Sequence, residues 1–227
     1  MPDEIHLRLP SRLSPSALAA TATTASTASA TSSPASSPEI SSTIPLIGTW
    51  YVVSSSVEFL KDKKNVSITY SLKEPGQAKD AGCNVVEFTK DTVLDSVTTY
   101  QSLSGEGCDV VDTTVGTERP TPNSLPGIFT WRGTGFAKFI TNRWEILGYG
   151  NLPLQGSKPI REGDEQPMWM VIYADKSMFS PSGLSIHSRA YKWLPPQIID
   201  QIRTALRSFQ PKELKDSVRN MVDVLQE

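Results

Sequence analysis

Apolar and polar residues alternate with a period of two over most of the chain after Ile47, the pattern of half-buried β-strands. About ten segments rich in β-branched and aromatic residues follow one another, and Pro- or Gly-containing breakers separate most of them. The segments are 51–53, 66–70, 83–89, 91–101, 109–116, 127–132, 135–141, 143–149, 168–174 and 183–189. No helical pattern lies between them, so the region predicts an antiparallel β-sandwich or barrel.

The period becomes that of an α-helix after Leu194, where two prolines suit a first helical turn. The apolar face of this helix comprises Ile198, Ile199, Ile202, Ala205, Leu206 and Phe209. Beyond Pro211, a second helical pattern comprises Leu214, Val218, Met221, Val222 and Leu225. We expect the first helix to pack on the β-domain, and the second either to pack there as well or to present a surface to a protein partner.

The first 43 residues consist mainly of Ala, Ser, Thr and Pro, a composition that buries too little apolar surface to fold. We therefore expect a disordered, low-complexity tail at 1–43, a β-domain with its packed helix at 44–210 and a helical extension at 211–227. The leucines and arginines near the start resemble an organelle-targeting peptide, but Asp3 and Glu4 argue against one. Without a continuous apolar stretch, classical secretion is disfavoured and a cytoplasmic location is favoured over an organelle.

The charges nearly cancel, with 22 Lys and Arg against 24 Asp and Glu. This balance gives no reason to expect a nucleic acid or an anionic membrane as partner. No segment approaches the ~20 apolar residues of a membrane span. The histidines, His6 and His187, leave little for a metal site, so we expect neither metal nor cofactor. The pairing of Cys83 with Cys108 stays open.

Three motifs occur in a characteristic order: Gly48-Thr49-Trp50 at the start of the β-domain, the run 169–174 in a penultimate strand, and Ser188-Arg189 before the Leu-Pro-Pro helix entry. Together they resemble the lipocalins, over about residues 45–210. The resemblance implies an all-β fold, an antiparallel up-and-down β-barrel of 8–10 strands, with one or more C-terminal α-helices. It also implies that Gly48, Trp50 and Arg189 form a structural floor, with the guanidinium over the indole. The chain departs from the family in its larger strand count and in the element before the penultimate strand, which is only Leu-Gly-Tyr-Gly at 147–150.

Because side chains alternate across a strand, an inward Trp50 fixes the phase of its own strand, and the family's register fixes that of others. For 143–149 we favour Trp144 and Ile146 inward, whereas the opposite phase would bring in Arg143, Glu145 and Tyr149. The candidate ligand-binding residues are Val52, Ser54, Ile68, Tyr70, Trp144, Ile146, Met170, Ile172, Ser185 and His187. This apolar and aromatic set with a few polar groups is typical of a small-molecule pocket.

Three functions follow as hypotheses. The first is binding of a small hydrophobic molecule, such as a lipid, isoprenoid, pigment or polyketide, in the barrel. The second is an enzyme, an isomerase or cyclase of a hydrophobic intermediate, in which His187 and Tyr70 are the candidate catalytic groups. Ser185 lies two residues from His187 on the same face, too far along a strand to predict a catalytic dyad. The third is an interaction subunit that contacts a protein partner through residues 211–227.

Overall fold

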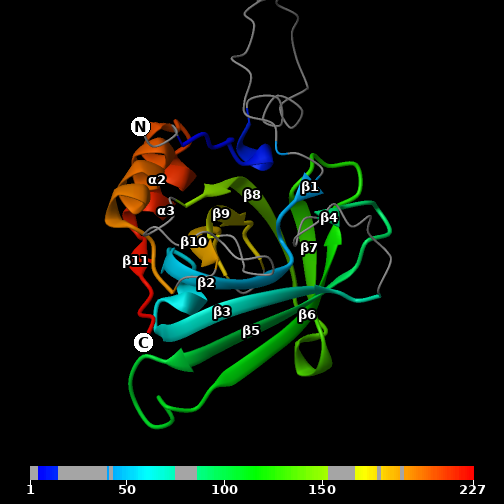
Figure 1. Cartoon of the computed structure of the whole chain (residues 1–227), viewed down its shortest axis with the longest axis vertical. Coiled ribbons are helices and arrows are strands. Elements are labelled where there is room, and N and C mark those ends of the chain that lie inside the picture. Colours follow the sequence, from blue (N-terminus) through cyan, green and yellow to red (C-terminus); the bar gives the residue numbers. More distant parts are fainter. Residues whose placement is uncertain are drawn as a thin grey trace, which may run out of the picture.

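A computed structural model describes residues 5–14, 40, 43–74, 86–152, 167–177, 180–189 and 192–227 of the protein. Within this part of the chain, eight antiparallel strands form a closed barrel (Figure 1). They are β2 (Gly48–Ser55), β3 (Lys63–Leu72), β5 (Leu94–Ser102), β6 (Asp112–Pro120), β7 (Ile128–Gly133), β8 (Thr141–Asn151), β9 (Met168–Ala174) and β10 (Gly183–Arg189). Each strand pairs with the next along the chain, and β10 pairs with β2 to close the barrel. The predicted up-and-down barrel with C-terminal helices is therefore confirmed.

Two predicted strands are not barrel strands, which explains the surplus in the predicted count. The segment 135–141 is wrong as a strand, because it begins with a 3-10 helix, η3 (Gly135–Ala137), in the β7–β8 connection. Gly135 has a φ of 58°, a left-handed conformation that turns the chain and that glycine adopts without strain. Of 83–89, only β4 (Val86–Glu87) is extended among the described residues, and it pairs with β1 (Thr43–Ile44) in a separate two-stranded sheet.

The described helices at the C-terminal end are α2 (Pro196–Ser208) and α3 (Lys212–Arg219). Helix α2 buries Ile198, Ile202 and Leu206, as its sequence pattern predicts. None of the described helices is long and apolar enough to cross a bilayer.

The second helical pattern ends earlier than its apolar spacing predicts, because the chain turns at Asn220 and becomes extended. Val222 then lies in β11 (Val222–Asp223), which pairs with the end of β2, and both Val222 and Leu225 are exposed. This edge of β2 is free because β3 pairs only with its first half, Gly48–Tyr51. An unpaired strand edge offers backbone donors and acceptors that the C-terminal segment can satisfy.

Apolar side chains form one layer inside the barrel and another between its outer wall and the helices. The inner layer includes Trp50, Tyr70, Leu94, Phe129, Trp144, Ile146, Met170 and Ile172. The outer layer includes Val53, Leu147, Trp169, Val171, Tyr173, Leu184 and Ile186, packed against Ile198, Ile202 and Leu206. Strands β9 and β10 are thus buried on both faces, in keeping with the continuous apolar run 168–173.

Residues 5–14 depart from the expected disordered tail, because they pack on the outer layer (Figure 1, blue). Leu7 and Leu13 are buried, the latter in the 3-10 helix η1 (Ser11–Leu13). The Arg8 amide donates a hydrogen bond of 2.8 Å to the Leu147 carbonyl. Leucines spaced through a polar segment provide enough apolar surface to dock on a wall that is already apolar. The rest of the predicted tail, apart from Ile40 and Thr43, lies outside the described residues. Cys83 lies outside them as well, so whether it pairs with Cys108 stays open.

Candidate functional site

One end of the barrel is closed by Trp50 and Arg189, which are partners across the β2–β10 ladder. The Arg189 guanidinium carbon lies 4.6 Å from the centre of the indole ring, and both side chains are almost fully buried. The indole Nε1 donates to the Leu46 carbonyl at 3.0 Å, and Arg189 donates to the Ile47 carbonyl. Gly48, with a φ of 111°, opens β2 in a conformation that favours glycine. This is the arrangement that the sequence resemblance implies for these three residues.

Nine of the ten predicted ligand-binding residues lie on the inner face of the barrel. Each of them either pairs across a ladder with a residue on the same face as Trp50 or packs with apolar side chains inside the barrel. They are Val52, Ile68, Tyr70, Trp144, Ile146, Met170, Ile172, Ser185 and His187.

Ser54 is the exception, and its prediction as an inward residue is wrong. A bulge places Val53 between the pairs His187–Val52 and Ile186–Ser54, which reverses the phase of the rest of β2. The Ser54 hydroxyl therefore lies outside the barrel, where it donates to the Val222 carbonyl at 3.1 Å and accepts from Arg203 of α2 at 3.0 Å.

A second bulge, at Leu147, decides the phase of 143–149. Trp144 and Ile146 face inward as favoured, and the added residue brings Tyr149 inward as well, opposite Met170. Glu145 faces outward, opposite Tyr173, so it does not reach the interior of the barrel.

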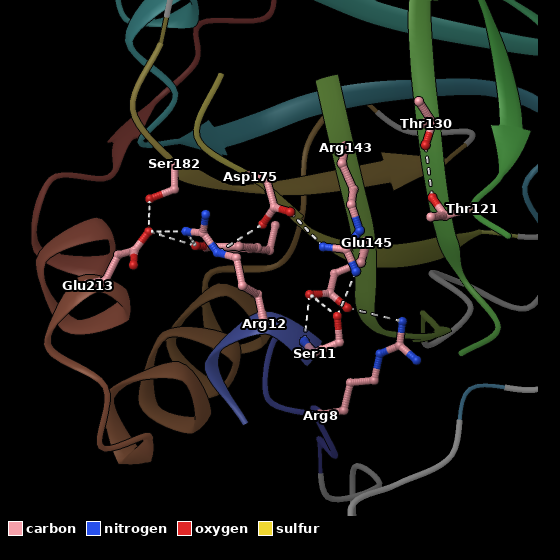
Figure 2. Close-up of polar contacts among 11 residues, drawn as sticks. Arg8, Ser11, Arg12, Thr121, Thr130, Arg143, Glu145, Asp175, Ser182 and Glu213 are labelled. Carbon is pink, nitrogen blue, oxygen red and sulfur yellow. Dashed lines mark hydrogen bonds and ion pairs between the residues drawn. The ribbon is translucent and has the colours of Figure 1, made fainter. Parts of the chain in front are cut away.

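The outward Glu145 instead fastens the N-terminal segment to the barrel wall (Figure 2). Its Oε1 accepts from the Ser11 amide at 2.7 Å, and its Oε2 lies 3.7 Å from the Arg8 guanidinium. Arg143 bridges the same two segments, since it donates to the Ser11 hydroxyl at 2.8 Å and to Asp175 at 2.6 Å. These contacts are structural and lie on the opposite face of β8 from the candidate site.

His187 is fully buried, and its Nε2 lies 2.8 Å from the Ser185 hydroxyl, so the two side chains are closer than strand spacing predicts. Both residues occupy inward positions of β10, two residues apart. Burial lowers the pKa of His187 to about 3, so the ring is neutral at physiological pH. Among the described residues, its Nδ1 has no hydrogen-bond partner.

Glu118 is a further interior polar group that the sequence prediction missed. It lies on β6 opposite Leu94 and Trp131, is 3% exposed, and accepts a 2.9 Å hydrogen bond from the Trp144 indole. Burial raises the pKa of this carboxyl to about 7, although the Trp144 and Ser96 side chains favour its ionised form. A carboxylate between polar residues normally marks the solvent face of a strand. Gly116, two residues earlier, lies on the same face of β6 as Glu118. The Trp131 ring covers Gly116, so a side chain at that position would clash with it.

We call the end of the barrel opposite Trp50 and Arg189 the open end; there the Phe59 ring packs edge-on against the Tyr100 ring, with 5.0 Å between their centroids. Several residues in inward ladder positions, among them Ile68, the ladder partner of Trp50, are only partly buried. They are Ile68, Thr98, Tyr100, Thr114 and Trp131. The loops β2–β3, β5–β6 and β7–β8 meet at this end, because successive strands are antiparallel. They carry the exposed apolar residues Phe59, Leu103, Val110, Val111, Phe136 and Phe139.

Neither a protein-family model nor a curated protein sequence matches the chain. Solved structures do match it. Apocrustacyanin C1 is 13% identical with a TM-score of 0.48, and lobster apocrustacyanin A1 is 14% identical with a TM-score of 0.46; each match covers 81% of this chain and 78% of that one. The siderocalin Ex-FABP is 14% identical with a TM-score of 0.44, over 81% of this chain and 95% of that one. Similarity this distant carries no argument about function.

The barrel itself defines the class of fold. Its eight strands run up and down in sequence order, its floor is Trp50 under Arg189, and a helix follows the last strand. The protein therefore has a lipocalin-like fold.

Proposed function

We propose that the protein binds one small hydrophobic molecule in the upper part of the barrel, with a lipid, an isoprenoid, a pigment and a polyketide as the candidate classes. The observation that carries the proposal is a set of inward residues that are only partly buried: Ile68, Thr98, Tyr100, Thr114 and Trp131. Below them the barrel is packed, with Trp50, Tyr70 and Met170 almost completely buried. The hollow that this proposal requires is bounded mainly by apolar and aromatic side chains above a closed floor, which suits an apolar molecule that enters from the open end.

Most of the described inward side chains are apolar or aromatic, which also supports a hydrophobic ligand. His187 is held by Ser185, and Glu118 by the Trp144 indole. The exposed apolar side chains of the three loops at the open end add a surface over which an apolar molecule can pass.

Thr98 and Thr99 provide a matched pair of variants to test this proposal. Both lie on β5 and both are partly exposed, but Thr98 points inward, opposite Ile68, whereas the Thr99 hydroxyl contacts that of Ser67 on the outer face at 2.8 Å. Titration of the neutral dye Nile red should give saturable, one-site fluorescence enhancement with the wild type and with Thr99→Trp. Thr98→Trp should abolish it, because the indole occupies the hollow. Equal binding by the two variants would contradict an interior site.

An isomerase or cyclase acting in the same hollow is the alternative function. The two candidate catalytic groups support it less than they support binding, because burial lowers the pKa of His187 to about 3 and raises that of Tyr70 well above its ordinary value. Neither group exchanges a proton readily near neutral pH. If the protein turns over a hydrophobic intermediate, His187→Ala should slow that turnover; unchanged turnover would remove the histidine from the mechanism.

A protein partner at residues 211–227 is the third hypothesis. Leu214, Val218 and Val224 of this region are buried against the rest of the protein, so a partner would contact only the outer side of α3 and the chain beyond it. Pull-down with the full chain and with a chain that ends at residue 210 tests this contact.

A further inference from the structure

The inner wall around Glu118 is aromatic. Trp144 donates to the carboxyl, and its ring stacks on Phe129 at 4.7 Å between centroids and lies 6.0 Å from Tyr70. Trp131 is the ladder partner of Glu118 on β7. One carboxyl therefore faces the interior among four aromatic residues that come from β7, β8 and β3.

No cation neutralises this carboxyl among the described residues. Its own strand and β7 contribute Arg119 and Arg132, which take outward positions of the ladder. The groups that face it are Tyr70 from β3, Ser96 from β5, Trp131 from β7 and Trp144 from β8. Tyr70 is the only one of these four that can ionise, and it is neutral at physiological pH. A carboxyl buried without a counter-ion is costly unless something else supplies the charge.

We infer that Glu118 and the aromatic rings around it recognise the charged nitrogen of an otherwise apolar amine, which names the ligand class of the proposed site. A carboxylate pairs with an ammonium group, and the faces of Trp and Tyr rings attract the same cation. Glu118 in its ionised form repels an alkyl carboxylate with the same chain length as the amine. An alkyl alcohol of that length gains only a hydrogen bond from its uncharged hydroxyl. The inference rests on the proposed binding function and narrows it.

The pH dependence of the wild type gives a first test that needs no variant. The pKa of Glu118 is raised to about 7 by burial, so below that value the empty barrel holds a neutral carboxyl. A bound ammonium stabilises the ionised form, so the affinity for an amine must rise as Glu118 ionises. Dodecylamine should therefore bind more tightly at about pH 8 than at about pH 6, whereas dodecanol should bind equally at both.

The second test compares three probes of equal chain length, dodecylamine, dodecanol and dodecanoate, by displacement of Nile red at about pH 8, where the carboxyl is ionised. Dodecylamine should bind the wild type about ten- to a hundredfold more tightly than dodecanol, and dodecanoate should bind most weakly. Glu118→Gln keeps the size of the side chain and an acceptor for the Trp144 indole, but it should lose this preference. Asp95→Asn is the matched control, because Asp95 lies in the neighbouring ladder pair on the outer face of β5; it should retain the preference.

The outcomes separate the inference from the proposed function. Binding of Nile red with equal affinity for the amine and the alcohol overturns the amine site and leaves the binding function standing. A preference that persists in Glu118→Gln also overturns it. If the wild type binds neither Nile red nor any of the three probes, the proposed function fails and the amine site fails with it.

Discussion

Glu118 and His187 are buried titratable side chains on opposite walls of the barrel, four strands apart in either direction around the ladder. Burial shifts their pKa values in opposite directions, because it penalises the charged form of each. The neutral carboxyl stabilises the fold at low pH, and the neutral imidazole does so at high pH. Stability against pH therefore reports on the interior directly.

Glu118→Gln should change the pH dependence of stability between about pH 4.5 and pH 7. The pKa of this carboxyl is raised in the folded state, so its contribution is complete below its ordinary value near 4.5 and is lost as pH rises through about 7. Relative to the wild type, the variant should gain about 3 kcal/mol of unfolding free energy between about pH 4 and pH 8. Urea unfolding at a series of pH values measures it. His187 is present in both proteins, so its opposite contribution cancels when the unfolding free energies of the variant and the wild type are subtracted. If this difference does not vary with pH, Glu118 is not buried as described.

Arg189→Met should destabilise the barrel by about 2 kcal/mol, because it removes a desolvated cation–π contact with Trp50 and the hydrogen bond to the Ile47 carbonyl. Methionine keeps most of the apolar stem, so the loss measures the guanidinium rather than a large cavity. Denaturant unfolding provides the value, and Arg207→Met, an exposed position on α2, is the control that should leave stability unchanged. Equal stability of both variants would show that the floor does not depend on this pair.

At the scale of elements, two bulges decide which predicted residues reach the interior. Strict alternation from Trp50 places Val52 correctly but fails at Ser54, after the bulge at Val53. The bulge at Leu147 allows Trp144 and Tyr149 to share the inner face, which strict alternation forbids. A bulge depends on the pairing of two distant strands, so the local sequence does not reveal it.

The N-terminal segment is an element that composition alone misassigns. Residues 1–43 are mostly small and polar, and that average conceals Leu7 and Leu13, which dock on the outer layer. The polar side of the same segment depends on the buried pair Arg8 and Glu145.

Arg8→Met should cost about 3 kcal/mol, because it leaves the fully buried Glu145 without its nearest charge partner. Arg12→Met is the matched control in the same segment: the Arg12 side chain is 42% exposed, and its pairing with Glu213 should contribute less than about 1 kcal/mol. Thermal or urea unfolding of both variants measures the difference. Similar losses in the two would mean that the segment is not held through Glu145.

At the scale of the whole molecule, the sequence predicts the barrel, its floor and most of its inner face. The floor could be anticipated because Gly48, Trp50 and Arg189 stand at the ends of the strand-rich region in an order that resembles a known family. Glu118 could not be anticipated, because its burial depends on β5, β7 and β8 all placing apolar or aromatic side chains around it. The extension 211–227 was only partly foreseen, since β11 needs a free edge of β2 that no local pattern shows.

The central claim is that the hollow above Trp50 and Arg189 holds one small apolar molecule. Native mass spectrometry of the protein purified without denaturation from its own source measures this most directly. We expect the mass of the chain plus one small molecule for the wild type, and a ligand-free mass for Thr98→Trp produced in the same way. A wild-type mass equal to that of the chain alone, unchanged after incubation with Nile red, would contradict it.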